Sequence, residues 1–190
     1  MSYSIIIIHF NLSFRKMNKK EIAEYFLWFT GCIPQRLREL EGVVTQTPQF
    51  QEWRADLTPE SLDLLGEWFA AQVEIRPRSE NEIQEIRSRI SIPIEISGGE
   101  LTNRTFSLAV DVGMYLSQVF LNNHSALKWA QPFGSKRDVD YGQPVLAGFG
   151  RVFLNPVRIL IVLAYGVKSK TKSGKRLREI YEIWRGKICI

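Results

Sequence analysis

The amino-terminal residues carry a pattern of apolar and polar side chains that is typical of a strand. Residues 4–14 are rich in isoleucine and aromatic residues, and Phe10, Leu12 and Phe14 alternate with other positions. Alternation with a period of two places the apolar side chains on one face of an extended chain. We therefore predict an amphipathic strand over residues 4–14.

A helix is predicted to follow this strand, because Asn18 and Glu21 stand three positions apart, in the arrangement of a capping box. Apolar and aromatic residues then recur at helical spacing. Gly31 and Pro34 interrupt the pattern, since proline lacks the amide hydrogen that an inner helical turn needs. We predict that the helix breaks there and continues over residues 35–40 in a changed direction.

The rest of the chain alternates between helical and extended patterns. Local start signals mark several helices, such as threonine–proline–glutamate at 58–60 and asparagine–proline at 155–156. The β-branched run at 159–162 leaves a strand as the alternative over residues 155–167. The other predicted elements are helices at 58–73, 80–90, 104–121 and 175–185, strands at 92–96, 127–130 and 145–153, and a polar loop at 134–142.

Together these elements predict an α+β fold, in which five or six helices pack around or beside a small, mostly antiparallel sheet. The chain has 190 residues, of which 45% are hydrophobic, and this is enough for one well-buried core. No stretch has the composition of an interdomain linker. We therefore predict that residues 1–190 form a mainly helical, single globular domain.

Charge and cysteine content bear on the compartment and the partners. The net charge of +5 permits contact with nucleic acid or with an acidic protein. The two cysteines, Cys32 and Cys189, are far apart and do not indicate a disulfide framework. No secretory signal pattern is recognisable, and the apolar run at 159–165 is too short to span a bilayer. We expect a cytoplasmic protein without a membrane partner.

Motifs of known chemistry are missing from the sequence. His9, His124 and the two cysteines lack the spacing of metal ligands. The sequence contains no nucleophile elbow, phosphate-binding loop or dinucleotide-binding motif. We therefore expect no metal, no cofactor and no catalytic role. A hydrolase with an unrecognised site is kept as an alternative, and it would use Asp111, Asp138, Asp140 or His124.

Polar positions in the predicted helix 104–121 allow two interpretations. Asp111 and Tyr115 stand one turn apart on a polar stripe of an otherwise apolar segment. A carboxylate among apolar residues is costly to bury unless it is paired. Either an internal partner such as an arginine neutralises Asp111, or the stripe faces a binding cleft. Gly113 and Ser117 form a small-residue pair that would let another element approach closely.

The segment after this helix has the features of a recognition loop. Residues 128–144 mix a tryptophan, alternating charges, glycines and prolines, and loops of this kind often carry binding residues. An ordered loop without such a role is the alternative. The candidate binding residues in this loop are Trp129, Arg137, Asp138, Asp140 and Tyr141.

The C-terminal segment is strongly basic. Between Lys168 and Lys187 there are eight lysines and arginines but only two glutamates. Contacts with phosphates require such clustered cations, but the segment has no aromatic platform and no known nucleic-acid-binding motif. Three interpretations of this segment are therefore possible: a solvated basic face, a contact with an acidic protein partner, or a contact with nucleic acid. Contacts with nucleic acid would come from Lys170, Lys172, Lys175, Arg176 and Arg178.

Four motifs are spread over most of the chain: Asn-Lys-Lys-Glu-Ile-Ala-Glu-Tyr-Phe-Leu-Trp-Phe at 18–29, Leu-Thr-Pro-Glu-Ser-Leu at 57–62, Leu-Ala-Val-Asp-Val-Gly-Met-Tyr-Leu at 108–116 and Asp-Val-Asp-Tyr-Gly-Gln-Pro at 138–144. Together they resemble a group of uncharacterised bacterial proteins of similar length. The Asp-x-Gly-x-Tyr-Leu pattern, followed by a tryptophan and a Tyr-Gly-x-Pro turn, is also similar to a pattern in immunity proteins of bacterial toxin systems.

This resemblance implies a cytosolic protein-binding module that neutralises a toxin, and it supplies no catalytic residues. Such a module needs a complementary surface only, which agrees with the missing catalytic motifs. Another protein is therefore the partner we expect. A nucleic-acid-associated protein that uses the basic C-terminal segment, and the hydrolase, are the alternatives.

Overall fold

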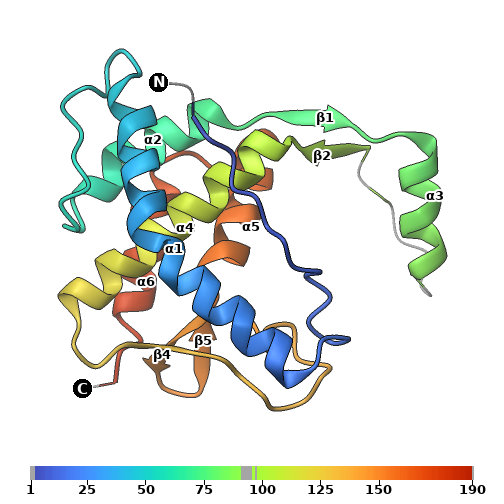
Figure 1. Ribbon diagram of the computed structural model, residues 1–190. Helices are drawn as coiled ribbons and strands as arrows, with labels where there is room; N and C mark the ends of the chain where they lie inside the picture. Colours follow the sequence, from blue (N-terminus) through green and yellow to red (C-terminus); the bar gives the residue numbers. More distant parts are fainter. Residues whose placement is uncertain (1–2, 91–95, 97, 190) are drawn as a thin grey trace.

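The computed structural model describes residues 3–90, 96 and 98–189 and has an α+β fold (Figure 1). Six helices and two small antiparallel sheets in these residues confirm the predicted fold class. The elements are α1 (Lys19–Thr45), α2 (Ser61–Gln72), β1 (Ile75–Pro77), α3 (Glu80–Arg89), β2 (Gly99–Leu101), α4 (Asn103–Asn123), β3 (Lys128–Ala130), β4 (Val145–Phe149), β5 (Val152–Leu154), α5 (Pro156–Lys168) and α6 (Arg176–Arg185).

Helix α1 begins as predicted but is unbroken where we expected an interruption. The Asn18 side chain accepts hydrogen bonds from the amides of Lys20 and Glu21, and the Glu21 carboxylate accepts one from the Asn18 amide. Pro34 lies inside the helix, and residues 35–40 simply continue it. The predicted break was wrong because proline removes one backbone hydrogen bond, whereas buried residues before and after it hold α1 against the core.

The N-terminal segment is extended but is not a strand. Residues 4–14 pair with no strand that the structure describes, so this prediction was wrong. The segment runs along α1 and α4 (Figure 1), where Ile6, Ile8 and Phe10 pack against a buried cluster. The alternation of apolar side chains is thus explained by packing of an extended backbone on helices, which needs no sheet.

Helix α4 is the central element of the fold. Fourteen of its residues are buried, and it contacts α1, α2, α5 and α6. Gly113 allows α5 to approach, because a Cβ atom at this position would lie 2.9 Å from the carbonyl oxygen of Pro156. The close approach expected at this glycine is therefore present.

The later strands form a small antiparallel sheet with the order β3-β4-β5. Residues 145–153, predicted as one strand, divide into β4 and β5, so that prediction was too simple. Gly150 stands between them with a φ of +71°, a conformation that glycine adopts without strain. The strand predicted at 92–96 lies outside the described residues except for Ile96.

The two possible structures for residues 155–167 are resolved in favour of a helix. The Asn155 side chain accepts a hydrogen bond from the Arg158 amide, and Pro156 occupies the first turn of α5. Proline is favourable there because its missing amide hydrogen would have no partner in any case. None of the helices in the described part of the chain is long and apolar enough to cross a membrane.

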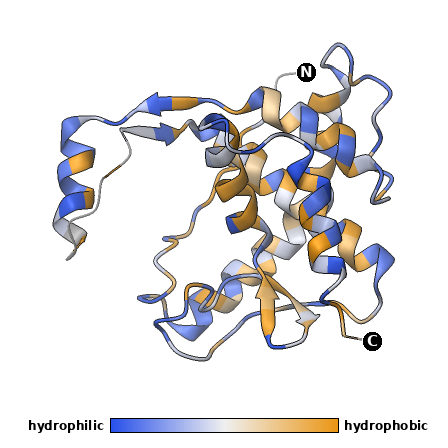
Figure 2. Cartoon of the chain, turned by 180° about the vertical axis from the view of Figure 1, so that it is seen from behind, coloured by the Kyte–Doolittle hydropathy of each residue, from blue (hydrophilic) through white to orange (hydrophobic). Residues whose placement is uncertain are grey.

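Strands β1 and β2 and helix α3 form an arm that projects from the rest of the molecule (Figures 1 and 2). The two strands pair antiparallel, and α3 stands at the far end. Among the α3 side chains that the structure describes, none is buried, and Figure 2 shows the helix as mainly hydrophilic. The arm therefore adds little to the core.

Candidate functional site

Asp111 has an internal partner, as one of the two interpretations required. Arg36 of α1 binds it in a bidentate arrangement, with Nε 2.8 Å from Oδ1 and Nη2 2.7 Å from Oδ2. The Tyr3 hydroxyl donates to Oδ2 and accepts a hydrogen bond from Arg36 Nη2. Ser107 Oγ lies 2.7 Å from this hydroxyl and accepts a hydrogen bond from the Ile6 amide. These polar groups satisfy one another inside the molecule.

Electrostatics agree with a closed ion pair. Burial raises the pKa of the Asp111 carboxyl, while the hydrogen bonds and charge of Arg36 oppose this shift. Burial lowers the pKa of Arg36, but the hydrogen bonds that Arg36 donates to Asp111 and the negative charge of Asp111 more than reverse this, so the net pKa is raised. Burial, and then the Asp111 charge, also raise the pKa of Tyr3. The Asp111 side chain is 0% exposed, so it faces no open cleft.

Tyr115 has a different environment from Asp111, although both belong to the same polar stripe. Its hydroxyl lies 2.6 Å from Ser61 Oγ and accepts a hydrogen bond from the Leu57 amide. Its ring packs edge-on against Trp53, with 5.3 Å between the ring centroids. One turn of α4 is thus tied to α1, and the next turn is tied to the start of α2.

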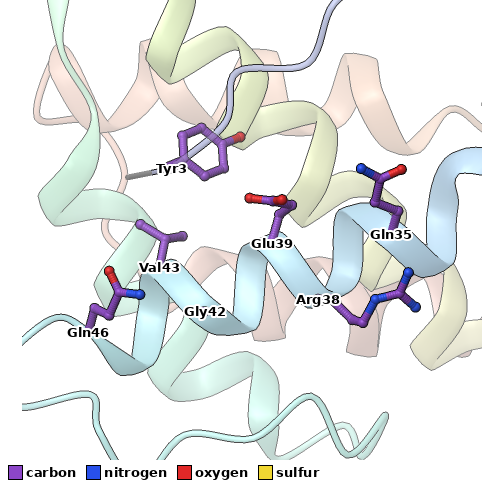
Figure 3. A pocket seen from close by; sticks show the side chains of 7 residues that line it. All are labelled: Tyr3, Gln35, Arg38, Glu39, Gly42, Val43 and Gln46. Atoms are coloured by element: carbon purple, nitrogen blue, oxygen red, sulfur yellow. The ribbon is translucent and has the colours of Figure 1, made fainter. Parts of the chain in front are cut away.

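A pocket of about 220 Å³ lies beside the buried ion pair, between the N-terminal segment and α1 (Figure 3). In this view the Glu39 side chain extends on the same side of α1 as the Tyr3 ring. The pocket offers hydrogen-bonding groups but contains no pair of nucleophile and base. It is lined by Tyr3, Gln35, Arg38, Glu39, Gly42, Val43 and Gln46.

Three of the residues predicted in the recognition loop attach this loop to the molecule. Trp129 packs edge-on against Phe29, with 5.6 Å between the ring centroids. Tyr141 is buried in the same cluster, and Asp140 forms an ion pair of 3.0 Å with Arg158. These side chains hold the loop in place and present little of their own surface.

The other two predicted loop residues, Arg137 and Asp138, are exposed beside a turn of the N-terminal segment. Arg15 Nη2 donates to the Arg137 carbonyl at 3.0 Å, and Lys136 Nζ donates to the Arg15 carbonyl at 3.3 Å. Two segments far apart in sequence therefore lie side by side (Figure 1). We call the following residues the basic loop surface: Arg15, Lys16, Phe133, Lys136, Arg137 and Val139.

The basic loop surface combines charge with exposed apolar groups. Three of its residues, Arg15, Lys16 and Val139, line an open cavity of about 790 Å³. Phe133 is 45% exposed and Val139 is 58% exposed. Its four cations form no ion pair with any residue in the described ranges. The nearby Asp138 carboxylate accepts a hydrogen bond from the Ser135 amide. Such a surface complements an acidic, partly apolar partner.

The basic C-terminal segment carries less free charge than its composition indicates. Arg176 pairs with Glu179 at 2.8 Å, and Arg178 pairs with Glu60 at 3.1 Å and with Glu182 at 2.9 Å. Arg176 and Arg178, two of the residues predicted to contact nucleic acid, thus form ion pairs with carboxylates. The other three are exposed lysines: Lys170, Lys172 and Lys175.

The histidines and cysteines do not assemble into a site. His124 Nε2 lies 2.9 Å from the Tyr181 hydroxyl, and burial lowers the pKa of His124. His9 is exposed on the N-terminal segment. Burial raises the pKa of Cys32, which favours the unreactive thiol. Among the residues with described positions, no group of three or more histidine, cysteine, aspartate or glutamate side chains could hold a metal ion.

Five members of the basic loop surface were missed by sequence reasoning: Arg15, Lys16, Phe133, Lys136 and Val139. Arg15 and Arg137 are 122 positions apart, so no local pattern links them. Phe133, Lys136 and Val139 were inside the predicted loop but were not singled out. The only sequence signal was the pair of adjacent cations just before the start of α1.

Comparison of the chain with protein-family models, with curated proteins and with solved structures finds no match.

Proposed function

We propose that the protein is a binding module that recognises an acidic, partly apolar surface of another protein through the basic loop surface. One observation carries this proposal: the basic loop surface exposes Phe133 and Val139 together with four cations that have no acidic partner among the described residues. Arginine and aromatic side chains are frequent anchors of protein interfaces. Charge complementarity adds partner selection and fast association.

The attachment of the loop supports the same proposal. Trp129 and Tyr141 pack in a buried cluster, and the hydrogen bond from Arg15 to Arg137 fixes the two segments together. A surface that is already ordered loses less conformational entropy when a partner binds. The specific form that we propose, following the sequence resemblance, is an immunity protein that covers a toxin in the cytoplasm.

The test is affinity purification of the tagged full chain from its own cells, at low and at high salt, with identification of bound proteins by mass spectrometry. Arg15→Glu combined with Arg137→Glu should release the partner that the unchanged protein retains. The matched control, Lys168→Glu combined with Lys170→Glu, reverses two exposed charges elsewhere and should leave the partner bound.

If both double variants capture the same amount of the partner protein, the basic loop surface is excluded as the interface. If the unchanged protein captures nucleic acid and no protein, and only Arg15→Glu combined with Arg137→Glu loses this nucleic acid, the partner of the basic loop surface is nucleic acid and the proposed protein partner is wrong. The immunity role has its own test. The captured protein should be toxic when produced alone, and the unchanged chain, but not the first double variant, should protect the cell.

A further inference from the structure

A second concave surface lies between α5 and α6, on elements that the basic loop surface does not use. This pocket has a volume of about 280 Å³. Its floor is apolar, because Leu163 and Ile180 are almost fully buried. The lining residues are Ile159, Val162, Leu163, Gly166, Thr171, Lys172, Arg176, Ile180, Ile183 and Trp184.

The two ends of this α5–α6 pocket differ in polarity. Lys172 and Arg176 stand at the end where the chain passes from α5 to α6, and Ile159 and Ile183 stand at the other end. Ile183 lies seven positions after Arg176 along α6, which corresponds to about 10 Å of helix. The pocket is therefore a short apolar trough with cations at one end. Lys187 lies over the Trp184 ring and does not line the trough.

The loop between the helices holds Lys172 over the trough. The amides of Thr171 and Lys172 both donate to the Gly166 carbonyl, at 2.9 and 3.0 Å. A Cβ atom on Gly166 would lie 2.6 Å from Lys172 Cγ, so the missing side chain leaves room for the lysine stem. Within the part of the chain that the structure describes, Lys172 has no ion pair, whereas Arg176 is paired with Glu179.

We propose that the α5–α6 pocket binds a small amphiphile with one anionic head group, of the chemical class of medium-chain fatty acids. The apolar chain would lie along the trough, and Lys172 would bind the head group. Val162 is 63% exposed and Ile183 is 46% exposed at the rim, so such a chain would remove apolar surface from water. The pocket volume of about 280 Å³ is at the lower end of the range for small-molecule sites, which favours a small amphiphile as the occupant.

The experiment is calorimetric titration of the full chain with decanoate below its micelle concentration, beside titration with the uncharged decan-1-ol. We expect saturable binding of one decanoate and at least tenfold weaker binding of the alcohol. Lys172→Ala should weaken decanoate binding about tenfold, which corresponds to the loss of about 1.4 kcal/mol. Ile183→Asp should abolish binding, and it should fold because this side chain is already half exposed.

Leu27→Asp is the matched control, because Leu27 is 69% exposed on α1 and lies outside the pocket. This variant should bind decanoate like the unchanged protein. Unfolding midpoints of both aspartate variants check that each is folded, and Val162→Asp replaces Ile183→Asp if the latter is not. The proposal is overturned if decanoate does not bind saturably or if decan-1-ol binds equally well. It is also overturned if the folded Ile183→Asp variant, or Val162→Asp in its place, binds decanoate as tightly as Leu27→Asp does. None of these results depends on the basic loop surface.

Discussion

At the scale of single residues, the buried pair of Arg36 and Asp111 has the largest consequence for the fold. It joins α1, α4 and the N-terminal segment through side chains that are 7% and 0% exposed. A buried ion pair adds little stability compared with apolar residues, but removal of one partner leaves the other charge without compensation. The role of Asp111 can therefore be measured by removing its charge.

Asp111→Asn should lower the free energy of unfolding by about 3–5 kcal/mol, because the Arg36 charge would stay buried without a counter-charge. Urea denaturation gives this difference. Glu24→Ala is the control, since it breaks a pair with Lys20 whose side chains are 55% and 86% exposed, and it should leave stability nearly unchanged. If the two variants lose equal stability, Asp111 is not the structural residue described above.

At the scale of elements, α1 contains a proline that its surroundings tolerate. Pro34 is exposed and cannot donate a hydrogen bond to the Thr30 carbonyl four residues earlier. Phe29 and Ile33 before it, and Leu40 after it, are buried. Tertiary packing therefore outweighs a local preference that would otherwise break this helix.

Pro34→Ala should raise the free energy of unfolding by about 1–2 kcal/mol. The helix gains about 3 kcal/mol in intrinsic preference, and the greater freedom of the unfolded chain removes about 1 kcal/mol of this. Thermal and urea unfolding measure the change. The neighbouring Gln35→Ala, also at an exposed position, should have a much smaller effect. A destabilised Pro34→Ala variant would mean that the ring itself packs in the native state.

The helices were predictable because their start signals are local. Asn18 with Glu21, and Asn155 with Pro156, cap helices at the positions predicted from the sequence. The errors concern extended segments. Residues 4–14 have the alternation of a strand, yet whether an extended segment pairs with a strand or packs on helices depends on distant parts of the chain. The same limit applies to the division of 145–153 into two strands.

Candidate sites were predictable only in part, for the same reason. The sequence indicated that Asp111 needs a partner, but Arg36 lies 75 positions away and could not be identified. The basic C-terminal segment could be recognised from its composition. The ion pair of Arg178 with Glu60 is a tertiary contact, which the sequence does not reveal. Exposure also cannot be read from residue type. Trp129 lies against the core, whereas Phe133, four positions later, is 45% exposed.

At the scale of the whole molecule, the chain divides into a core built on α4 and an arm that ends in α3. Fourteen residues of α4 are buried, whereas α3 has no buried side chain among those described. The arm is held by polar contacts: Arg76 pairs with Glu82 and with Glu100. Ser79 caps α3 through a capping box with Glu82. Exposed polar contacts of this kind open more easily than a packed core.

Hydrogen exchange of the amides should therefore separate the two parts. Amides in the middle of α4 should exchange only through global unfolding, so their opening free energy should equal that of the whole protein and fall steeply with added urea. Amides of α3 should exchange through local opening that responds little to urea. Glu82→Gln, which weakens both the cap and the Arg76 pair, should speed exchange in α3 and leave α4 unchanged. If α3 exchanges as slowly as α4, or if Glu82→Gln lowers protection in both helices, the arm unfolds together with the core and is not an independent unit.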